Sequence, residues 1–137
     1  MINKLKAYLK EKGSAALIMS EENICYFTSF HSTNGYLLVT GDKAVFLTDS
    51  RYIEAAQNKI TSCDEILQIK SMEAELMPLI DSLEIKQLEL ESERVTVSRY
   101  QKIKELVTDA SVICDGALDC AIDDIRIRKM TSRFQRL

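Results

Sequence analysis

Few residues in this sequence are candidates for catalysis or binding, and the single histidine is one of them. His31 lies in a run of small polar residues from Thr28 to Asn34, which is typical of a surface loop. Because histidine has a near-neutral pKa, it can donate a hydrogen bond to a carboxylate or accept one from an amide. A lone histidine in a polar loop is also commonly a solvated surface residue, and the residues alone leave both interpretations open.

A second candidate is the pair formed by Asp49 and Arg51, which follows an apolar run. These two side chains could act as an acid/base pair. An aspartate ahead of a helix more commonly caps that helix and pairs with a nearby arginine. We therefore favour a structural ion pair, with Asp49 or Ser50 as the helix cap.

No other group of residues indicates a catalytic centre. The sequence has no Gly-x-Ser-x-Gly elbow, P-loop or Gly-x-Gly-x-x-Gly motif. The four cysteines, at positions 25, 63, 114 and 120, form no Cys-x-x-Cys pair, so we expect ordinary thiols. The carboxylates are scattered, whereas a two-metal hydrolase needs several of them and a histidine in one cavity. We predict no catalytic residue and no metal ligand in this chain.

Length and charge restrict the class of protein. A chain of 137 residues suits one domain, which buries roughly two-thirds of its unfolded surface. The net charge of −3, from 18 basic and 21 acidic residues, is too small to attract nucleic acid or an anionic membrane. The longest apolar run, Ala15–Met19, is far below the roughly 20 residues that span a bilayer, and no signal peptide is recognisable. We expect a cytoplasmic protein with neither nucleic acid nor a membrane as partner.

The predicted secondary structure around these side chains is centred on a hairpin. Two short apolar runs, Tyr36–Val39 and Ala44–Leu47, flank Gly41 and Asp42, which can supply the positive φ angles of a tight turn. Because successive residues are apolar, each strand is expected to be covered on both faces. The prediction is an antiparallel hairpin at the centre of the sheet.

Strand and helix patterns alternate along the rest of the chain. Helices are predicted near residues 2–12, 20–27, 51–59, 75–83, 98–106 and 117–125, and strands near 15–19, 65–69, 88–91 and 111–114. This alternation predicts an α/β fold: a three-layer sandwich with a mixed sheet of five or six strands that contains the central hairpin, and helices on both faces.

Several polar positions and one proline allow sharper expectations. Glu89 and Glu91 alternate with leucines, which predicts a strand with one wet face near an edge of the sheet. Asp119 is expected on the wetter side of the last helix. Pro78 is expected in the first turn of its helix, because deep inside it would cost roughly 3 kcal/mol. Ser98 is expected to cap the helix that begins there.

Four short motifs, taken together, resemble a known family. They are Glu22-Asn23-Ile24, Tyr26-Phe27-Thr28, Gly35-Tyr36-Leu37-Leu38-Val39 and Thr48-Asp49-Ser50-Arg51-Tyr52. Their order and spacing, over a stretch from Leu5 to Lys129, resemble the N-terminal domain of the creatinase/prolidase family, which includes Xaa-Pro dipeptidases and Xaa-Pro aminopeptidases. The resemblance implies such a domain over residues 1–129, with residues 130–137 starting the linker to a C-terminal catalytic domain.

The resemblance also implies a function. The parent enzyme would be a metallopeptidase with two divalent metal ions (Mn, Co or Zn) in its C-terminal domain, and this chain its non-catalytic N-terminal domain. The chain would contribute homodimer contacts and part of the site for an Xaa-Pro peptide. In several dimeric members, the loop that corresponds to the one with His31 reaches the partner subunit's active site. Phe30 could pack on the substrate proline or anchor that loop, and we favour the anchor. Arg51 completes the predicted substrate-binding residues.

A second hypothesis assigns the chain to another class. Some proteins of this fold are catalytically silent, so the chain could be a free-standing module that binds proteins or peptides. The two hypotheses differ in the sequence that the reading frame encodes beyond Leu137. A peptidase requires a region there with two aspartates, a histidine and two glutamates at metal-binding positions.

Overall fold

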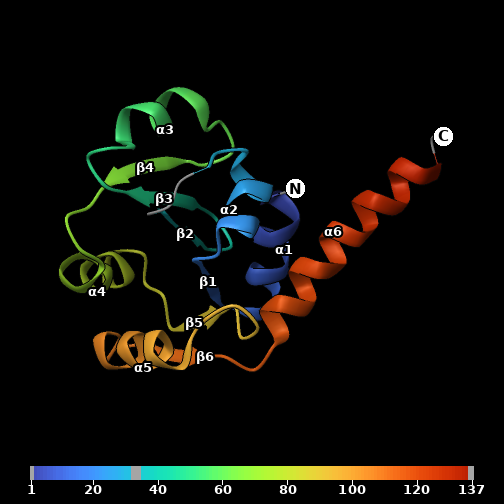
Figure 1. The fold of residues 1–137 in the computed structure, drawn as a ribbon. Helices are drawn as coiled ribbons and strands as arrows, with labels where there is room; N and C mark the ends of the chain where they lie inside the picture. Colours follow the sequence, from blue (N-terminus) through green and yellow to red (C-terminus); the bar gives the residue numbers. More distant parts are fainter. Residues whose placement is uncertain (1, 32–34, 136–137) are drawn as a thin grey trace.

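The computed structural model describes residues 2–31 and 35–135, and in this part of the chain six strands form one mixed sheet (Figure 1). The strands are β1 (Ala15–Ile18), β2 (Gly35–Val39), β3 (Ala44–Thr48), β4 (Glu65–Gln68), β5 (Gln87–Leu90) and β6 (Ser111–Ile113). Their spatial order is β4-β3-β2-β1-β5-β6. The β1–β2 and β2–β3 pairs are antiparallel, and the other three pairs are parallel. The mixed sheet predicted from the sequence is confirmed.

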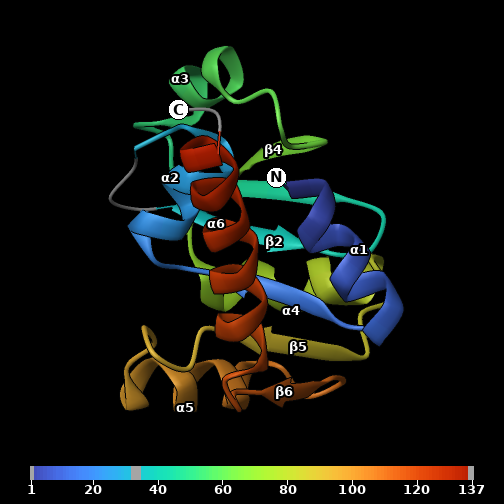
Figure 2. The same cartoon turned by 90° about the vertical axis from the view of Figure 1, so that its right-hand side faces the viewer.

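Helices cover both faces of this sheet (Figures 1 and 2). They are α1 (Ile2–Lys12), α2 (Glu21–Thr28), α3 (Ile53–Lys59), α4 (Met72–Ser82), α5 (Val97–Leu106) and α6 (Ala117–Gln135). Apolar side chains of α1, α2, α3 and α6 pack with Leu37 in one core, and those of α4 and α5 pack with Leu38 in the other. Because neighbouring residues of one strand enter opposite cores, the predicted three-layer sandwich is confirmed.

The hairpin of β2 and β3 lies inside the sheet, and the midline of the sheet falls between β2 and β1. Its turn differs from the prediction, because neither Gly41 nor Asp42 has a positive φ. The Thr40 hydroxyl closes the turn instead by accepting the backbone N–H groups of Asp42 at 3.2 Å and Lys43 at 2.9 Å. Glycine is needed at position 41 for close packing on α1: a Cβ there would lie 2.7 Å from that of Lys10.

Two helices begin earlier than predicted. Ser71 caps α4 and accepts a backbone N–H at 3.2 Å, so Pro78 lies inside the helix and not in its first turn. The missing N–H of Pro78 leaves the Ala74 carbonyl without its helical donor, but both residues are exposed and water can replace that donor. Thr96 caps α5 in place of Ser98, and its hydroxyl accepts a backbone N–H at 3.1 Å.

The predicted cap of α3 is also wrong. The helix begins at Ile53, and Tyr52 occupies the N-cap position without a side-chain capping bond. Neither Asp49 nor Ser50 reaches that position, because a turn intervenes. Within this turn the Asp49 carboxylate accepts the backbone N–H of Arg51 at 2.9 Å, and its backbone carbonyl accepts that of Ile53 at 3.1 Å.

The face of β5 that was predicted to be wet is buried. Glu89 and Glu91 are each 1% exposed. Strand β5 lies between β1 and the edge strand β6, so its predicted place near an edge is confirmed while the predicted wet face is not. One oxygen of Glu89 accepts from Lys12 Nζ at 3.0 Å. Asp119, predicted on the wet side of α6, is buried and accepts the backbone N–H of Ser92 at 2.7 Å. Donors from other elements replace water at the bonded oxygens of these carboxylates, whereas the second oxygen of Glu89 is buried without a hydrogen-bond partner in the described part of the chain.

Helix α6 continues without a break from Ala117 to Gln135. Leu118, Ile122 and Ile125 pack into the core beside α1, whereas the last part of the helix extends away from the sheet (Figure 1). The predicted boundary between residues 129 and 130 therefore falls within a helix. Residues 136–137 of the predicted linker lie outside the described part.

Candidate functional site

Helix α2 carries the predicted substrate-binding loop at its C-terminal end. Ser29 follows the helix with a φ of 59° and donates its backbone N–H to the Cys25 carbonyl at 2.7 Å. The Thr28 hydroxyl donates to the Ile24 carbonyl at 2.6 Å and accepts the backbone N–H of Phe30 at 3.2 Å. These bonds define the path of the chain up to Phe30.

Phe30 and His31 have different environments. Phe30 is buried, and its ring meets that of Phe46 edge to face with centroids 5.8 Å apart, so it anchors the loop to β3 as we favoured. His31 is exposed, and its Nε2 lies 3.3 Å from Cys25 Sγ. Residues 32–34 of the predicted loop lie outside the described part. Contact of either side chain with substrate stays a prediction.

Arg51 forms the ion pair that the sequence favoured. Its Nη2 lies 2.8 Å and its Nε 3.3 Å from the same Asp49 oxygen, and its guanidinium lies over the Tyr52 ring. The hydrogen bond that Arg51 donates to Asp49 raises the pKa of Arg51 above its usual value. Among the described residues, no hydrogen bond or ion pair joins Arg51 to Phe30 or His31. Within the described part, Arg51 contacts Asp49 and Tyr52, whereas Phe30 contacts Phe46 and His31 contacts Cys25.

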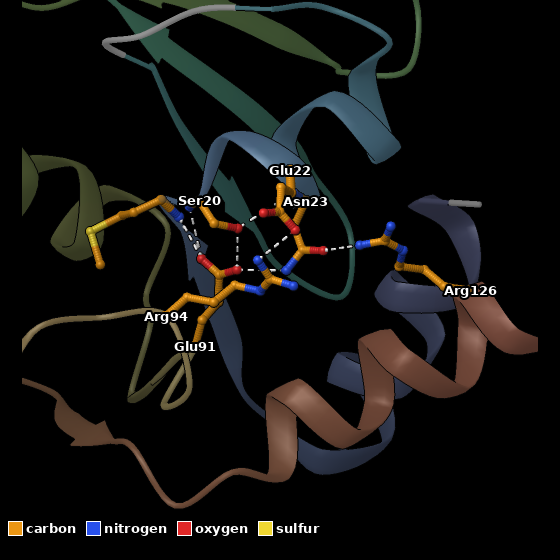
Figure 3. A network of polar contacts seen from close by, with 7 residues as sticks. Ser20, Glu22, Asn23, Glu91, Arg94 and Arg126 are labelled. Carbon is orange, nitrogen blue, oxygen red and sulfur yellow. Dashed lines mark hydrogen bonds and ion pairs between the residues drawn. The ribbon is translucent and has the colours of Figure 1, made fainter.

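A buried polar network joins β5 to the start of α2 (Figure 3). One Glu91 oxygen accepts the backbone N–H groups of Met19 at 2.8 Å and Ser20 at 3.0 Å. The other accepts from the Ser20 hydroxyl and from Asn23 Nδ2, both at 2.6 Å. Four donors from one short segment thus surround the Glu91 carboxylate, which the sequence pattern predicted to be exposed to solvent.

The network continues into α6. Arg126 Nη1 donates to Asn23 Oδ1 at 3.0 Å, and the guanidinium lies 5.1 Å from the centre of the Tyr26 ring. A separate, more exposed arginine, Arg94, pairs with Glu22 of α2 at 2.8 Å. We call Met19, Ser20, Asn23, Glu91 and Arg126 the Glu91 network.

A cleft of about 470 Å³ runs along α5, beside the ends of β1, β3 and β4, and Tyr36 of β2 also lines it. Arg99, Lys102 and Lys70 line it with basic groups, and Asp49 adds one carboxylate. Arg99 Nη1 lies 3.4 Å from the Tyr36 hydroxyl. None of the three predicted substrate-binding residues lines the cleft.

The remaining chemistry-bearing side chains are dispersed. All four cysteines are free thiols, and burial raises the pKa of Cys63 to about 11, which keeps that thiol protonated at neutral pH. Among the residues that the structure describes, no three His, Cys, Asp or Glu side chains are grouped so that they could hold a metal ion. Within the same residues, no helix combines the length and the apolar character that crossing a membrane requires.

Comparison with known proteins agrees with the fold and the motifs. The family described as "Creatinase/Prolidase N-terminal domain" matches residues 1–127. The chain belongs to this family. The resemblance carried by the motifs around α2, β2 and Arg51 is thereby confirmed for almost the whole chain.

Two kinds of relative show how this creatinase/prolidase N-terminal domain occurs elsewhere. A putative Xaa-Pro aminopeptidase of Mycoplasma genitalium is 33% identical over 137 residues, which cover 99% of this chain and 36% of that protein. The Xaa-Pro dipeptidase of Bacillus anthracis is 28% identical, with a TM-score of 0.77, over 85% of this chain and 33% of that one. This chain thus spans about a third of the length of these relatives.

The same domain also occurs as a separate structure. The N-terminal domain of a cytoplasmic peptidase from Mycobacterium tuberculosis is 25% identical, with a TM-score of 0.75. The match covers 88% of this chain and 96% of that one, so the two have nearly the same extent.

Proposed function

We propose that this chain is the non-catalytic N-terminal domain of a metal-dependent Xaa-Pro peptidase of the dipeptidase or aminopeptidase type. The match of the family over residues 1–127 carries the proposal, because the relatives with Xaa-Pro peptidase names contain this domain as about a third of a longer chain. The catalytic domain would hold two divalent metal ions, Mn, Co or Zn. The parent enzyme would act in the cytoplasm.

The proposed contribution of the domain is a set of homodimer contacts and one wall of the substrate site. The arrangement of Phe30 and His31, which follow α2, supports this role. Phe30 is anchored in the core, so the next residue, His31, is held at the surface. From there the imidazole would reach the active site of the partner subunit. It would donate a hydrogen bond to the carboxylate of an Xaa-Pro dipeptide.

Arg51 would add hydrogen-bond donors to this wall. The guanidinium is exposed, and Asp49 restricts it to one orientation. A preoriented guanidinium is suited to binding carboxylates, because it loses little conformational freedom on binding. Arg51 and His31 would then each bind a polar group of the peptide.

Hydrolysis by the complete protein tests the proposal. We expect the complete protein, supplied with Mn²⁺, Co²⁺ or Zn²⁺, to cleave an Xaa-Pro dipeptide or a longer Xaa-Pro peptide. The same peptides with alanine in place of proline should be poor substrates. A complete protein that is metal-loaded, cleaves none of these peptides and still binds them would contradict the peptidase assignment and leave the silent binding module.

A further inference from the structure

Arg126 of α6 contacts α2 at two points on one helical face. Its Nη1 donates to Asn23 Oδ1 at 3.0 Å, and its guanidinium stacks 5.1 Å from the centre of the Tyr26 ring (Figure 3). Asn23 and Tyr26 are three residues apart, so they are neighbours on the surface of α2. A planar guanidinium that bonds at its edge and stacks on its face has its position defined in two directions.

The asparagine that receives this bond is itself held rigidly. Asn23 is 2% exposed, and its Nδ2 donates to Glu91 at 2.6 Å while its Oδ1 faces Arg126. Turning the amide over would place its NH₂ group against the guanidinium and its oxygen against the carboxylate, which removes both bonds. The Glu91 network therefore provides one acceptor, in one orientation, for the arginine of α6.

Apolar packing alone leaves the orientation of α6 less well defined. Leu118, Ile122 and Ile125 bury one side of the helix, but hydrophobic contact is not directional and permits small rotations and shifts. Ile127, the residue after Arg126, is already 59% exposed. The contact of Arg126 with α2 thus lies where α6 leaves the core, and small rotations there are amplified along the rest of the helix.

We propose that Arg126 is a positioning residue that sets the angle between α6 and α2. Helix α2 leads through the anchored Phe30 to His31, and α6 leads away from the domain (Figure 1). The same contact therefore determines the position of His31 relative to a domain that is attached to α6. That last step rests on the proposed function, in which α6 leads to the catalytic domain.

Residual dipolar couplings of the 137-residue chain measure this angle directly. In the unaltered chain, the backbone N–H couplings of α2, α6 and the sheet should fit one alignment tensor. Arg126→Met keeps an unbranched apolar stem but loses the charge and the donors, so the α6 couplings should cease to fit the tensor of the sheet. Arg94→Met is the matched control, because it removes the other arginine that pairs with α2 and does not lie on α6; all its couplings should still fit one tensor.

A role confined to stability would lower the melting temperature of Arg126→Met without rotating α6. An α6 that keeps its orientation in Arg126→Met would overturn the proposal. Should that variant not fold, Tyr26→Leu removes the ring under the guanidinium, and an unrotated α6 there would have the same meaning. The measurement requires no hydrolysis, so it fails or succeeds independently of the proposed peptidase function.

Discussion

Individual carboxylates connect elements that are far apart in the sequence. Glu89, Glu91 and Asp119 are all buried, and each accepts hydrogen bonds from another element. Burial of a charged group is costly unless donors replace its water, so these bonds serve mainly to make the burial tolerable. Glu89 also raises the pKa of Lys12 to about 12 through the hydrogen bond between them. Loss of Lys12 would leave the buried Glu89 without its counter-charge, whereas Lys12 itself is exposed to water.

Glu91 is the carboxylate whose neutralisation should cost most. We expect Glu91→Gln to lower the free energy of unfolding by about 3 kcal/mol, because an amide nitrogen would replace one acceptor oxygen opposite hydrogen-bond donors. Urea denaturation followed by circular dichroism gives this value. Glu93→Gln, at an exposed position in the same segment, should change it little. Equal stabilities for Glu91→Gln and the unaltered chain would contradict the assigned network.

Asp64 should contribute a pH-dependent part of the stability. The hydrogen bond from Lys6, and next that from the backbone N–H of Ala44, lower the pKa of Asp64 below its usual value. Its contribution is therefore present above the ordinary aspartate pKa of about 3.9 and is lost as the pH falls through the lower folded value. Asp64→Asn should lose less stability between pH 5 and pH 3 than the unaltered chain in urea denaturation. The exposed Asp109→Asn should lose as much as the unaltered chain, and a full-sized loss in Asp64→Asn would contradict the assignment.

His31 is the residue on which the proposed substrate wall depends. In the complete enzyme, His31→Ala should lower kcat/KM for an Xaa-Pro substrate tenfold or more, which corresponds to about 1.4 kcal/mol of transition-state stabilisation. Metal content and melting temperature should stay unchanged. Gln57→Ala, at an exposed site on α3, serves as the control and should retain full activity. Unaltered kcat and KM in His31→Ala would return this histidine to the solvated surface residue that its sequence context also permits.

At the scale of elements, helix beginnings depend on which hydroxyl reaches the free backbone N–H groups. Thr96 caps α5 although Ser98 stands before a glutamine at the spacing of a capping box. The cap at Thr96 adds Val97 to the start of the helix, and this side chain is 73% exposed. Backbone hydrogen bonding, and not apolar burial, therefore determines where α5 starts.

The two candidate caps of α5 are separable by experiment. Thr96→Ala should destabilise the chain by about 1 kcal/mol, because it removes the acceptor for a backbone N–H in the first turn. Ser98→Ala should have an effect near zero, since Ser98 already lies inside the helix. Thermal and urea unfolding of both variants would give the difference. A larger effect at Ser98 than at Thr96 would mean that α5 begins where the sequence pattern placed it.

Most elements could be predicted from the sequence because their signals are local. The hairpin, the buried β1 and the apolar face of α6 each follow from the periodicity of neighbouring residues. The environment of β5 could not be predicted in this way, because the donors to Glu91 lie 68 to 72 residues away in the chain. Alternating leucine and glutamate is the pattern of a half-exposed strand, and only tertiary contacts reverse it. In the predicted site, the burial of Phe30 and the Asp49–Arg51 pair could be predicted from the sequence. The contact of Arg126 with α2 could not, because no pattern of neighbouring residues indicates it.

At the scale of the whole molecule, the sheet makes two cores interdependent. Adjacent residues of β1 and β2 face opposite cores, so neither helical layer can detach without exposing apolar surface of the strands. We therefore expect one cooperative unfolding transition. Helix α6 is the described element that extends beyond this unit (Figure 1), which agrees with a proposed role as the connection to a catalytic domain.

This domain is proposed to support peptide hydrolysis without performing it, and a comparison of the complete protein with the 137-residue chain tests that division of roles. Release of proline from an Xaa-Pro dipeptide is measured with Mn²⁺ for the complete protein and for the 137-residue chain, each with and without EDTA. We predict turnover by the complete protein that EDTA abolishes, and no turnover by the 137-residue chain under any of these conditions. Metal-dependent proline release by the 137-residue chain alone would show that this domain is itself catalytic and would contradict its proposed non-catalytic role.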